Sequence, residues 1–329
     1  IAAQNELTSA DHCLLILPLF HVNSICASLL ASLSVGAQVT MLERFDPAVF
    51  IATVNEKKPT YFSAVPAILA RLAETPAETQ FNTDSLRFAL CGAAPISVEL
   101  LNKCETRLGI AILEGYGLTE TAAPSHSNPP DRPKRQCLGI PFMSVDSRVV
   151  DPETLKELPV GESGEIVTHG PQVFKGYWKR PEATAAAFFE RDGKRFFRTG
   201  DMGRVDEEGY FFMTDRLKRM INASGFKVWP AEVEALMFRH PAIQEACIIA
   251  TRDAYRGESV KAVVVLREAH KGKVSEQDII DWCRDNMAVY KIPRSVQFVD
   301  ALPKSGSGKV MWRLLQEAES AALDAAKAG

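Results

Sequence analysis

Short apolar runs alternate with amphipathic stretches from the start of the chain to about residue 117. This pattern is typical of a doubly wound parallel sheet, in which helices cover both faces of apolar strands. Helix-start signals stand between the runs, since Asp46 precedes Pro47 and Ser97 precedes a stretch that ends near Leu108. We predict strands buried on both faces at residues 14–17, 38–42, 60–63, 87–91 and 111–113.

The pattern changes after residue 142, where short segments of alternating apolar and polar positions are separated by glycine-rich turns. A period of two residues predicts strands with one buried face. We therefore expect this stretch to form a small β-barrel or sandwich, with strands at residues 145–150, 165–168, 195–198 and 209–213.

A third pattern begins at residue 216, with a strand near Met220, a helix that Pro230 starts, and strands at residues 245–251 and 260–266. Ser275 and Asp278 form a capping box that predicts a helix start, and the alanine-rich residues 318–329 predict a fraying helix. The fold class is therefore α/β. We expect the latter part of a large α/β domain over residues 1–142, a β-barrel subdomain over 143–215, and a separate, mobile α+β domain over 216–329.

Composition changes this picture little. The 329 residues include 38 Lys and Arg against 41 Asp and Glu, and this net charge of −3 gives no electrostatic preference for nucleic acid or an anionic membrane. Residues 14–33 are apolar enough to suggest a membrane span, but Pro18, His21 and Asn23 interrupt them, which favours a buried strand followed by a buried helix. Seven cysteines without a Cys-x-x-Cys pair predict reduced thiols in the cytoplasm.

Several catalytic motifs are absent from the sequence. The segment PKSGSGKV at residues 303–310 resembles a phosphate-binding Walker A loop, but it has Pro303 in place of glycine and Val310 in place of the hydroxyl that binds magnesium. There is no Gly-x-Ser-x-Gly elbow, and the six histidines lack the spacing of metal ligands. Hydrolase and zinc-enzyme functions are therefore disfavoured.

Glycine-framed loops follow two of the predicted strands, at the sheet edge where open α/β sheets bind ligands. The loop Gly92-Ala93-Ala94-Pro95 is small enough for a flat ring or a phosphate to approach its backbone. The loop GYGLTE at residues 115–120 combines an aromatic ring, a hydroxyl and a carboxylate that suits Mg²⁺. In the segment FRTGD, Asp201 supplies a carboxylate on a turn, suited to a ribose diol.

Four segments, GYGLTE, FRTGD, DRLKRMINASGFKVWPAEVE and PKSGSGK, stand in this order from residue 115 to residue 309. In sequence and spacing they resemble the adenylate-forming superfamily of acyl-CoA synthetases, carrier-domain adenylation domains and luciferases. PLFH at residues 18–21 and the Gly92 loop also match. In the family, a Ser/Thr/Gly-rich loop that grips the β- and γ-phosphates precedes PLFH. That loop is absent here, so we expect the chain to be truncated at its amino terminus.

The resemblance implies a two-step ligase, most like the fatty-acyl-CoA synthetases. A carboxylate attacks the α-phosphate of ATP to give an acyl-adenylate, and the thiol of coenzyme A then displaces AMP. By this resemblance Lys309 bridges the carboxylate and the α-phosphate, Thr119 binds a phosphate oxygen and Glu120 holds Mg²⁺. Asp201 and Arg216 bind the ribose, and adenine lies among Gly92, Ala93, Ala94, Tyr116, Gly117 and Met213.

For the second step, the family rotates its carboxy-terminal domain about a hinge, which Lys218 occupies here. The rotation withdraws Lys309 and brings in a segment that binds CoA. The resemblance places CoA at Ser224, Gly225 and Lys227, and the acyl pocket at His21, Ser24 and Ala122, with Ala123 beside it.

Each assignment has a structural alternative. Glu120 and Asp201 are also suited to capping a turn, and Tyr116 and His21 to packing in a core. Arg216, Lys218, Lys227 and Lys309 would then be solvated charges, and the small pocket residues would pack helices.

Two functional alternatives stay open beside the CoA ligase: an inert or binding-only fragment, because the phosphate loop is absent, and a ligase that loads acids onto the pantetheine of a carrier protein. For the CoA ligase, the expected partners are a small-molecule carboxylic acid, ATP and CoA, and no nucleic acid.

Overall fold

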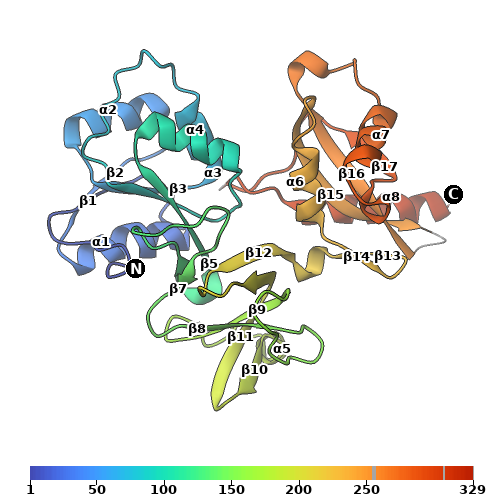
Figure 1. Cartoon of the computed structure of the whole chain (residues 1–329), viewed down its shortest axis with the longest axis horizontal. Coiled ribbons are helices and arrows are strands. Elements are labelled where there is room, and N and C mark those ends of the chain that lie inside the picture. Colours follow the sequence, from blue (N-terminus) through green and yellow to red (C-terminus); the bar gives the residue numbers. More distant parts are fainter. Residues whose placement is uncertain (254–256, 307, 329) are drawn as a thin grey trace. The chain divides into compact units, whose positions relative to one another are not determined.

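A computed structural model describes residues 1–253, 257–306 and 308–328 of the chain. The chain divides into two compact units (Figure 1). The first comprises residues 1–199 and 203–213, and the second comprises residues 200–202 and 214–329. Among the described residues, no helix is both long and apolar enough to cross a lipid bilayer.

The first unit contains a seven-stranded sheet in the order β2-β1-β3-β4-β5-β6-β7. The strands from β2 to β5 pair in parallel. All five predicted strands are therefore present, but β2 is an edge strand with no buried residue, so the prediction that every strand is buried on both faces is wrong there. The strands are β1 (His12–Leu15), β2 (Gln38–Met41), β3 (Tyr61–Ala64), β4 (Phe88–Cys91), β5 (Ala111–Leu118), β6 (Ala123–Ser127) and β7 (Ile140–Pro141).

Helices cover both faces of this sheet, with α2, α3 and α4 on one side and α1 on the other (Figure 1). On the first side, Phe50, Leu69 and Leu101 pack against strand residues; on the other, Ala31 packs among Tyr61, Phe88 and Leu113. This arrangement confirms the doubly wound fold. The helices are the π-helical turn η1 (Ser24–Leu30), α1 (Ala31–Ser34), α2 (Pro47–Lys57), α3 (Pro66–Ala73) and α4 (Val98–Leu108).

Local signals in the sequence set the ends of these helices. The side chain of Asp46 accepts from the backbone N–H groups of Ala48 and Val49, and that of Ser97 accepts from Leu100. Both predicted caps are thus confirmed. The apolar run over residues 14–33 is a strand followed by a helix, as expected, but Leu30 and Leu33 are more than half exposed, so the helix is not wholly buried.

A five-stranded β-sheet follows in the chain, in the order β10-β11-β9-β8, and the long strand β11 also pairs with β12. The β-rich middle piece is therefore present. Strand β11 pairs with β10, β9 and β12, so the sheet branches at β11 and does not form one closed ring of strands. Its elements are β8 (Asp146–Val150), β9 (Gly164–His169), α5 (Pro181–Ala186), β10 (Phe188–Arg191), β11 (Lys194–Val205) and β12 (Phe211–Arg216).

The second unit is an α+β structure with its own core. Its sheet has the order β14-β13-β16-β15, with β17 parallel to β16. The Ser275–Asp278 capping box begins α7 as predicted. Helix α8 begins well before residue 318, because Trp312 and Leu315 pack on the β15–β16 surface. Gly329, the last residue of the predicted helix, lies outside the described residues. The elements are β13 (Ile221–Ala223), β14 (Phe226–Val228), α6 (Pro230–Met237), β15 (Ile243–Asp253), β16 (Gly257–Leu266), α7 (Glu276–Asn286), β17 (Ser295–Phe298) and α8 (Trp312–Ala328).

Phe50 offers a test of the first unit's core. Its ring is fully buried and contacts the rings of Phe45, Phe62 and Phe81 at centroid distances of 5.9, 5.0 and 6.0 Å. Phe50→Ala should lower the free energy of unfolding by about 3 to 5 kcal/mol, measured by urea denaturation. The control is Val49→Ala on the exposed side of the same helix, for which we expect a change of about 0.5 kcal/mol. Equal losses for both variants would contradict this packing.

Candidate functional site

Strand β5 leaves the parallel sheet at Glu114 and continues as one arm of an antiparallel hairpin with β6. The expected loop over residues 115–118 is therefore a strand, and only Thr119–Thr121 form a short 3₁₀ turn, η2. The two arms lie so close at Gly117 that a Cβ there would be 2.0 Å from the carbonyl oxygen of Ala123. The missing side chain of Gly117 is what allows the hairpin to close.

The hairpin tip is held by Thr121, whose hydroxyl accepts from the N–H of Leu118 at 2.9 Å and donates to the carbonyl of Ala123 at 2.8 Å. Ala122 and Ala123 have positive φ angles of 51° and 92°. Left-handed backbone at two consecutive alanines is costly, and such strain is common at ligand sites. The turn leaves Thr119 exposed and Glu120 half-buried.

Two contacts from residues 170–178 reach Glu120. The Tyr177 hydroxyl donates to Glu120 Oε1 at 3.0 Å, and the N–H of Phe174 donates to the Glu120 carbonyl at 2.8 Å. Sequence reasoning missed Tyr177, although it stands in an aromatic-rich loop. Among the described residues, no three His, Cys, Asp or Glu side chains gather as a metal cage. A single carboxylate suits Mg²⁺, which usually keeps waters and binds with substrate phosphates.

The Gly92 loop packs against the start of the hairpin. A Cβ on Gly92 would lie 3.3 Å from the carbonyl oxygen of Gly115, so the two glycine segments are neighbours as expected. Ala93 is exposed and has a positive φ of 69°, while Ala94 is half-buried. This edge of the sheet therefore combines small side chains, an exposed residue at Ala93 and a third alanine with a positive φ.

Tyr116 is almost fully buried, and its ring centroid lies 5.5 Å from that of His126 on β6. His126 is fully buried, lies 4.8 Å from the ring of Phe211 and shares a 2.9 Å hydrogen bond between Nδ1 and the hydroxyl of Ser125. Burial lowers the pKa of His126 to about 3, so its imidazole is neutral at physiological pH. Whether Tyr116 also stacks on adenine stays a prediction.

In the second unit, the structure brings Asp201, Arg216 and Lys309 near one another. Asp201 lies within strand β11 and not on a turn, and it is fully buried, with Arg216 Nε 2.9 Å from its Oδ1. Lys309 is exposed overall, but the protein around its ammonium group partly removes water from it. This desolvation lowers the pKa of Lys309, and the positive charge of Arg216 lowers it further. Among the described residues, Lys309 forms no ion pair.

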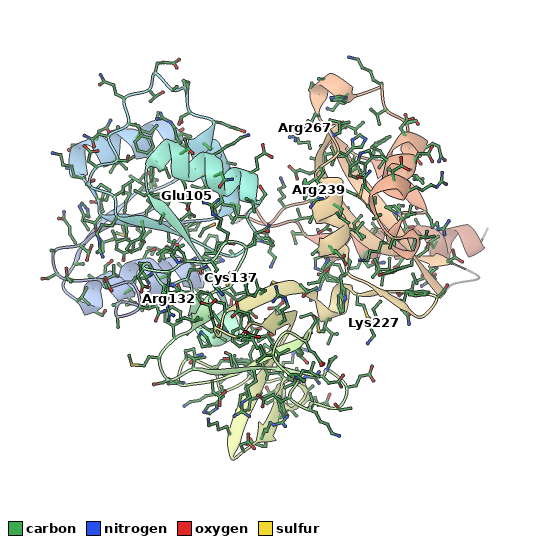
Figure 2. The ribbon with its side chains drawn as sticks, viewed as in Figure 1. Glu105, Arg132, Cys137, Lys227, Arg239 and Arg267 are labelled. Carbon is green, nitrogen blue, oxygen red and sulfur yellow. The ribbon has the colours of Figure 1, made fainter. Side chains whose placement is uncertain are left out.

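The hinge and CoA candidates are all exposed. Lys218 lies in the 3₁₀ turn η3 (Leu217–Arg219). Ser224 and Gly225 form the tip of the β13–β14 hairpin with positive φ angles of 56° and 86°, and Lys227 extends from the same hairpin (Figure 2). This hairpin therefore offers a cation beside a glycine with no atom within 4 Å of where its Cβ would stand.

The acyl-pocket candidates differ in what they offer. His21 is half-buried, and its Nδ1 accepts from the N–H of Asn23 at 3.2 Å. Ser24 is fully buried and donates to the carbonyl of Leu17 at 2.7 Å, so its hydroxyl proton is already used and its side chain is closed to solvent. Ala122 is exposed at the hairpin tip. Met213, which was assigned to adenine and not to the acyl pocket, is half-buried at the last position of the first unit.

Two titratable groups lie at the base of the hairpin, the half-buried Glu114 and the buried Cys137. Glu114 accepts from the N–H of Gln136 at 2.7 Å, and burial raises its pKa to about 7. The neighbouring thiol of Cys137 (Figure 2) donates to the carbonyl of Phe211 at 3.2 Å, and burial raises its pKa to about 11. Cys137 is therefore a packed thiol and not a nucleophile.

Known families match both units. Residues 1–178 match the model of the AMP-binding enzyme family, and residues 232–309 match that of the AMP-binding enzyme C-terminal domain. Among curated relatives, a long-chain-fatty-acid–CoA ligase of Bacillus subtilis is 39% identical over 94% of this chain, a feruloyl-CoA synthase of Amycolatopsis is 37% identical over 94%, and a 4-coumarate–CoA ligase of Nicotiana tabacum is 35% identical over 96%. The chain spans 55%, 62% and 58% of their respective lengths.

Solved structures agree with these matches. ATP-bound MatB from Rhodopseudomonas palustris superposes with a TM-score of 0.89 at 34% identity, and o-succinylbenzoate CoA synthetase from Bacillus subtilis, in complex with its acyl-adenylate, superposes with a TM-score of 0.84 at 31% identity. The alignments cover 96% and 95% of this chain and 62% of each of those chains. The resemblance to adenylate-forming acyl-CoA synthetases is confirmed.

The close approach at Gly117 can be tested by adding one methyl group. Gly117→Ala should lower the free energy of unfolding by at least about 3 kcal/mol, because its Cβ would overlap backbone that cannot move without opening the hairpin. Gly115→Ala on the same strand is the matched control, since its Cβ would meet its nearest neighbour at 3.4 Å. For the control we expect a change below about 1 kcal/mol in thermal and urea unfolding. Similar behaviour of the two variants would refute the role of Gly117.

Glu114 predicts a pH dependence of stability. Because its pKa is raised in the folded state, the stabilisation of its protonated form is fully present below about pH 4.5 and is lost as the pH rises through about 7. The glutamine of Glu114→Gln cannot ionise. Between pH 5 and pH 8, the free energy of unfolding of this variant should therefore rise relative to that of the unsubstituted protein, by at most about 3 kcal/mol. Urea unfolding at both pH values measures this gain. Glu99→Gln on the exposed face of α4 is the control, and a gain no larger than the control's would disprove the assignment.

Proposed function

The chain belongs to the AMP-binding enzyme family, and on this premise we propose that the protein carrying it is an ATP-dependent carboxylate–CoA ligase. The observation that carries the proposal is the place of Lys309, an exposed lysine without an ion pair among the described residues, beside the Asp201–Arg216 pair. A cation held near other charged groups and left unpaired suits a reaction in which negative charge grows on phosphate.

In the first half-reaction, a carboxylate oxygen of the acid attacks the α-phosphorus of ATP. The bond from the α-phosphorus to the bridging oxygen breaks, and pyrophosphate leaves with the bonding electron pair. Lys309 would bind the acid's carboxylate and the α-phosphate, and the exposed Thr119 hydroxyl would donate to a phosphate oxygen. Glu120 would hold Mg²⁺, which neutralises charge on the phosphates of bound ATP. Asp201 and Arg216 would bind the ribose.

In the second half-reaction, the sulfur of CoA attacks the acyl carbon of the adenylate, the acyl–oxygen bond breaks, and AMP leaves with that oxygen. We place the hinge at Lys218, because it is exposed in a short turn just after the boundary between the two units. Ser224, Gly225 and Lys227 would then face the pantetheine and a CoA phosphate. The same adenylate would meet two surfaces of the second unit in turn.

A fatty acid is the substrate we propose. In its support, a long-chain-fatty-acid–CoA ligase is the relative with the highest identity among those named above, although aromatic-acid ligases follow closely. We place the reaction in the cytoplasm, in line with seven cysteines that form no disulfide.

A substrate panel tests the proposal. The full protein is incubated with ATP, Mg²⁺, CoA and one acid at a time, drawn from short, medium and long fatty acids, ferulate and 4-coumarate, and the release of pyrophosphate and acyl-CoA is followed. We expect both products with fatty acids. Products with hydroxycinnamates alone would replace the substrate class, and thioester on a carrier protein without turnover of free CoA would identify a carrier-loading ligase. No product with any acid would leave a binding-only chain.

Lys309→Ala separates the half-reactions. Removing the ammonium should slow adenylate formation about 100-fold or more, because a donor to the developing charge is lost, and should spare thioester formation from preformed acyl-adenylate. The control is Lys304→Ala in the same segment, since Lys304 pairs with Glu245 at 2.7 Å and should matter little to either step. Equal loss in both half-reactions would contradict the role given to Lys309.

A further inference from the structure

An aromatic cluster anchors the loop that contacts Glu120. The ring of Phe174 lies 4.9 Å from Tyr177, 5.4 Å from Phe188 on β10 and 5.3 Å from Phe197 on β11. Aromatic rings in offset and edge contacts fix one another's orientation. The loop is therefore attached to the sheet of β10 and β11 through the ring of Phe174.

The backbone around Tyr177 is also fixed. Its N–H donates to the hydroxyl of Thr184 at 2.9 Å, and that hydroxyl donates onward to the carbonyl of Arg180 at 2.9 Å. Gly176 has a φ of 152°, and a Cβ there would lie 2.5 Å from the Thr184 methyl group. Thr184 on α5 thus packs against the turn that presents the tyrosine.

From this base the loop holds Glu120 at two points, the backbone carbonyl through Phe174 N–H and the carboxylate through the Tyr177 hydroxyl. The two contacts join segments more than fifty positions apart in the chain. A hydrogen bond to one carboxylate oxygen limits the rotation of the side chain and leaves the second oxygen for another ligand.

We propose that Tyr177 is a positioning residue for the magnesium-binding carboxylate: its hydroxyl occupies Oε1 of Glu120 and so directs Oε2 to Mg²⁺ bound with ATP. This inference rests on the proposed function, which gives Glu120 its metal. Partners that hold a metal ligand by a hydrogen bond typically change metal affinity about 10- to 100-fold when they are removed.

Binding measurements on the full protein test this role without turnover. Calorimetry of ATP binding is carried out at a series of Mg²⁺ concentrations and in EDTA. Tyr177→Phe keeps the ring in its cluster and removes only the hydroxyl, so it should raise the Mg²⁺ concentration for half-maximal tight ATP binding about tenfold. ATP affinity in EDTA should equal that of the unsubstituted protein.

The matched control is Tyr210→Phe, which removes the hydroxyl that donates to the carbonyl of Arg132 at 2.6 Å, away from Glu120. Its Mg²⁺ requirement should not change, whatever its effect on stability. An equal rise in both tyrosine variants, or no rise in Tyr177→Phe, would overturn the inference.

Glu120→Gln completes a double-mutant cycle. If Tyr177 acts through the carboxylate, adding Tyr177→Phe to Glu120→Gln should leave the Mg²⁺ requirement unchanged, and a full tenfold rise in that background would overturn the inference. Failure of the unsubstituted protein to bind ATP at any Mg²⁺ concentration would overturn the proposed function together with this inference. ATP binding that ignores Tyr177 would overturn the inference alone.

Discussion

The close backbone contact between Gly117 and Ala123 is the constraint on which the candidate site depends. It lets β5 run on from a parallel sheet into an antiparallel hairpin, and the hairpin carries Tyr116 on one arm, Thr119 and Glu120 at its tip and His126 on the other arm. The Gly92 loop packs against the same strand. One residue without a side chain thus lets the two arms and the tip of the hairpin come together, beside the Gly92 loop, at the sheet edge where α/β folds bind ligands.

Charge is arranged differently in the two units. The hairpin of the first unit offers a half-buried carboxylate and an exposed hydroxyl, which suit a hydrated cation and a phosphate. In the second unit, the buried carboxylate of Asp201 pairs with Arg216, and among the described residues Lys309 forms no ion pair of its own. An adenylate-forming reaction needs both kinds of group, a metal ligand for the leaving pyrophosphate and a cation for the attacking carboxylate.

Local chemistry predicted much of the fold. Asp46, Ser97 and Ser275 cap helices through contacts within three residues, so a short stretch of sequence suffices to find them. The errors come from strand pairing, which a nearby glycine does not reveal. Residues 115–118 and Asp201 were expected in turns because glycine stands beside them, but residues 115–118 pair with residues 123–127 in a hairpin, and Asp201 lies in the sheet strand β11. Tyr177 was missed because only the folded chain brings it to Glu120.

The central claim, that a carboxylate attacks the α-phosphorus of ATP at this site, is tested most directly by isotope transfer. An accepted acid labelled with ¹⁸O in both carboxylate oxygens is turned over with ATP and CoA, and the products are weighed by mass spectrometry. The account predicts AMP that carries one ¹⁸O, acyl-CoA that keeps the other, and unlabelled pyrophosphate. Label in inorganic phosphate with formation of ADP, or unlabelled AMP, would contradict it.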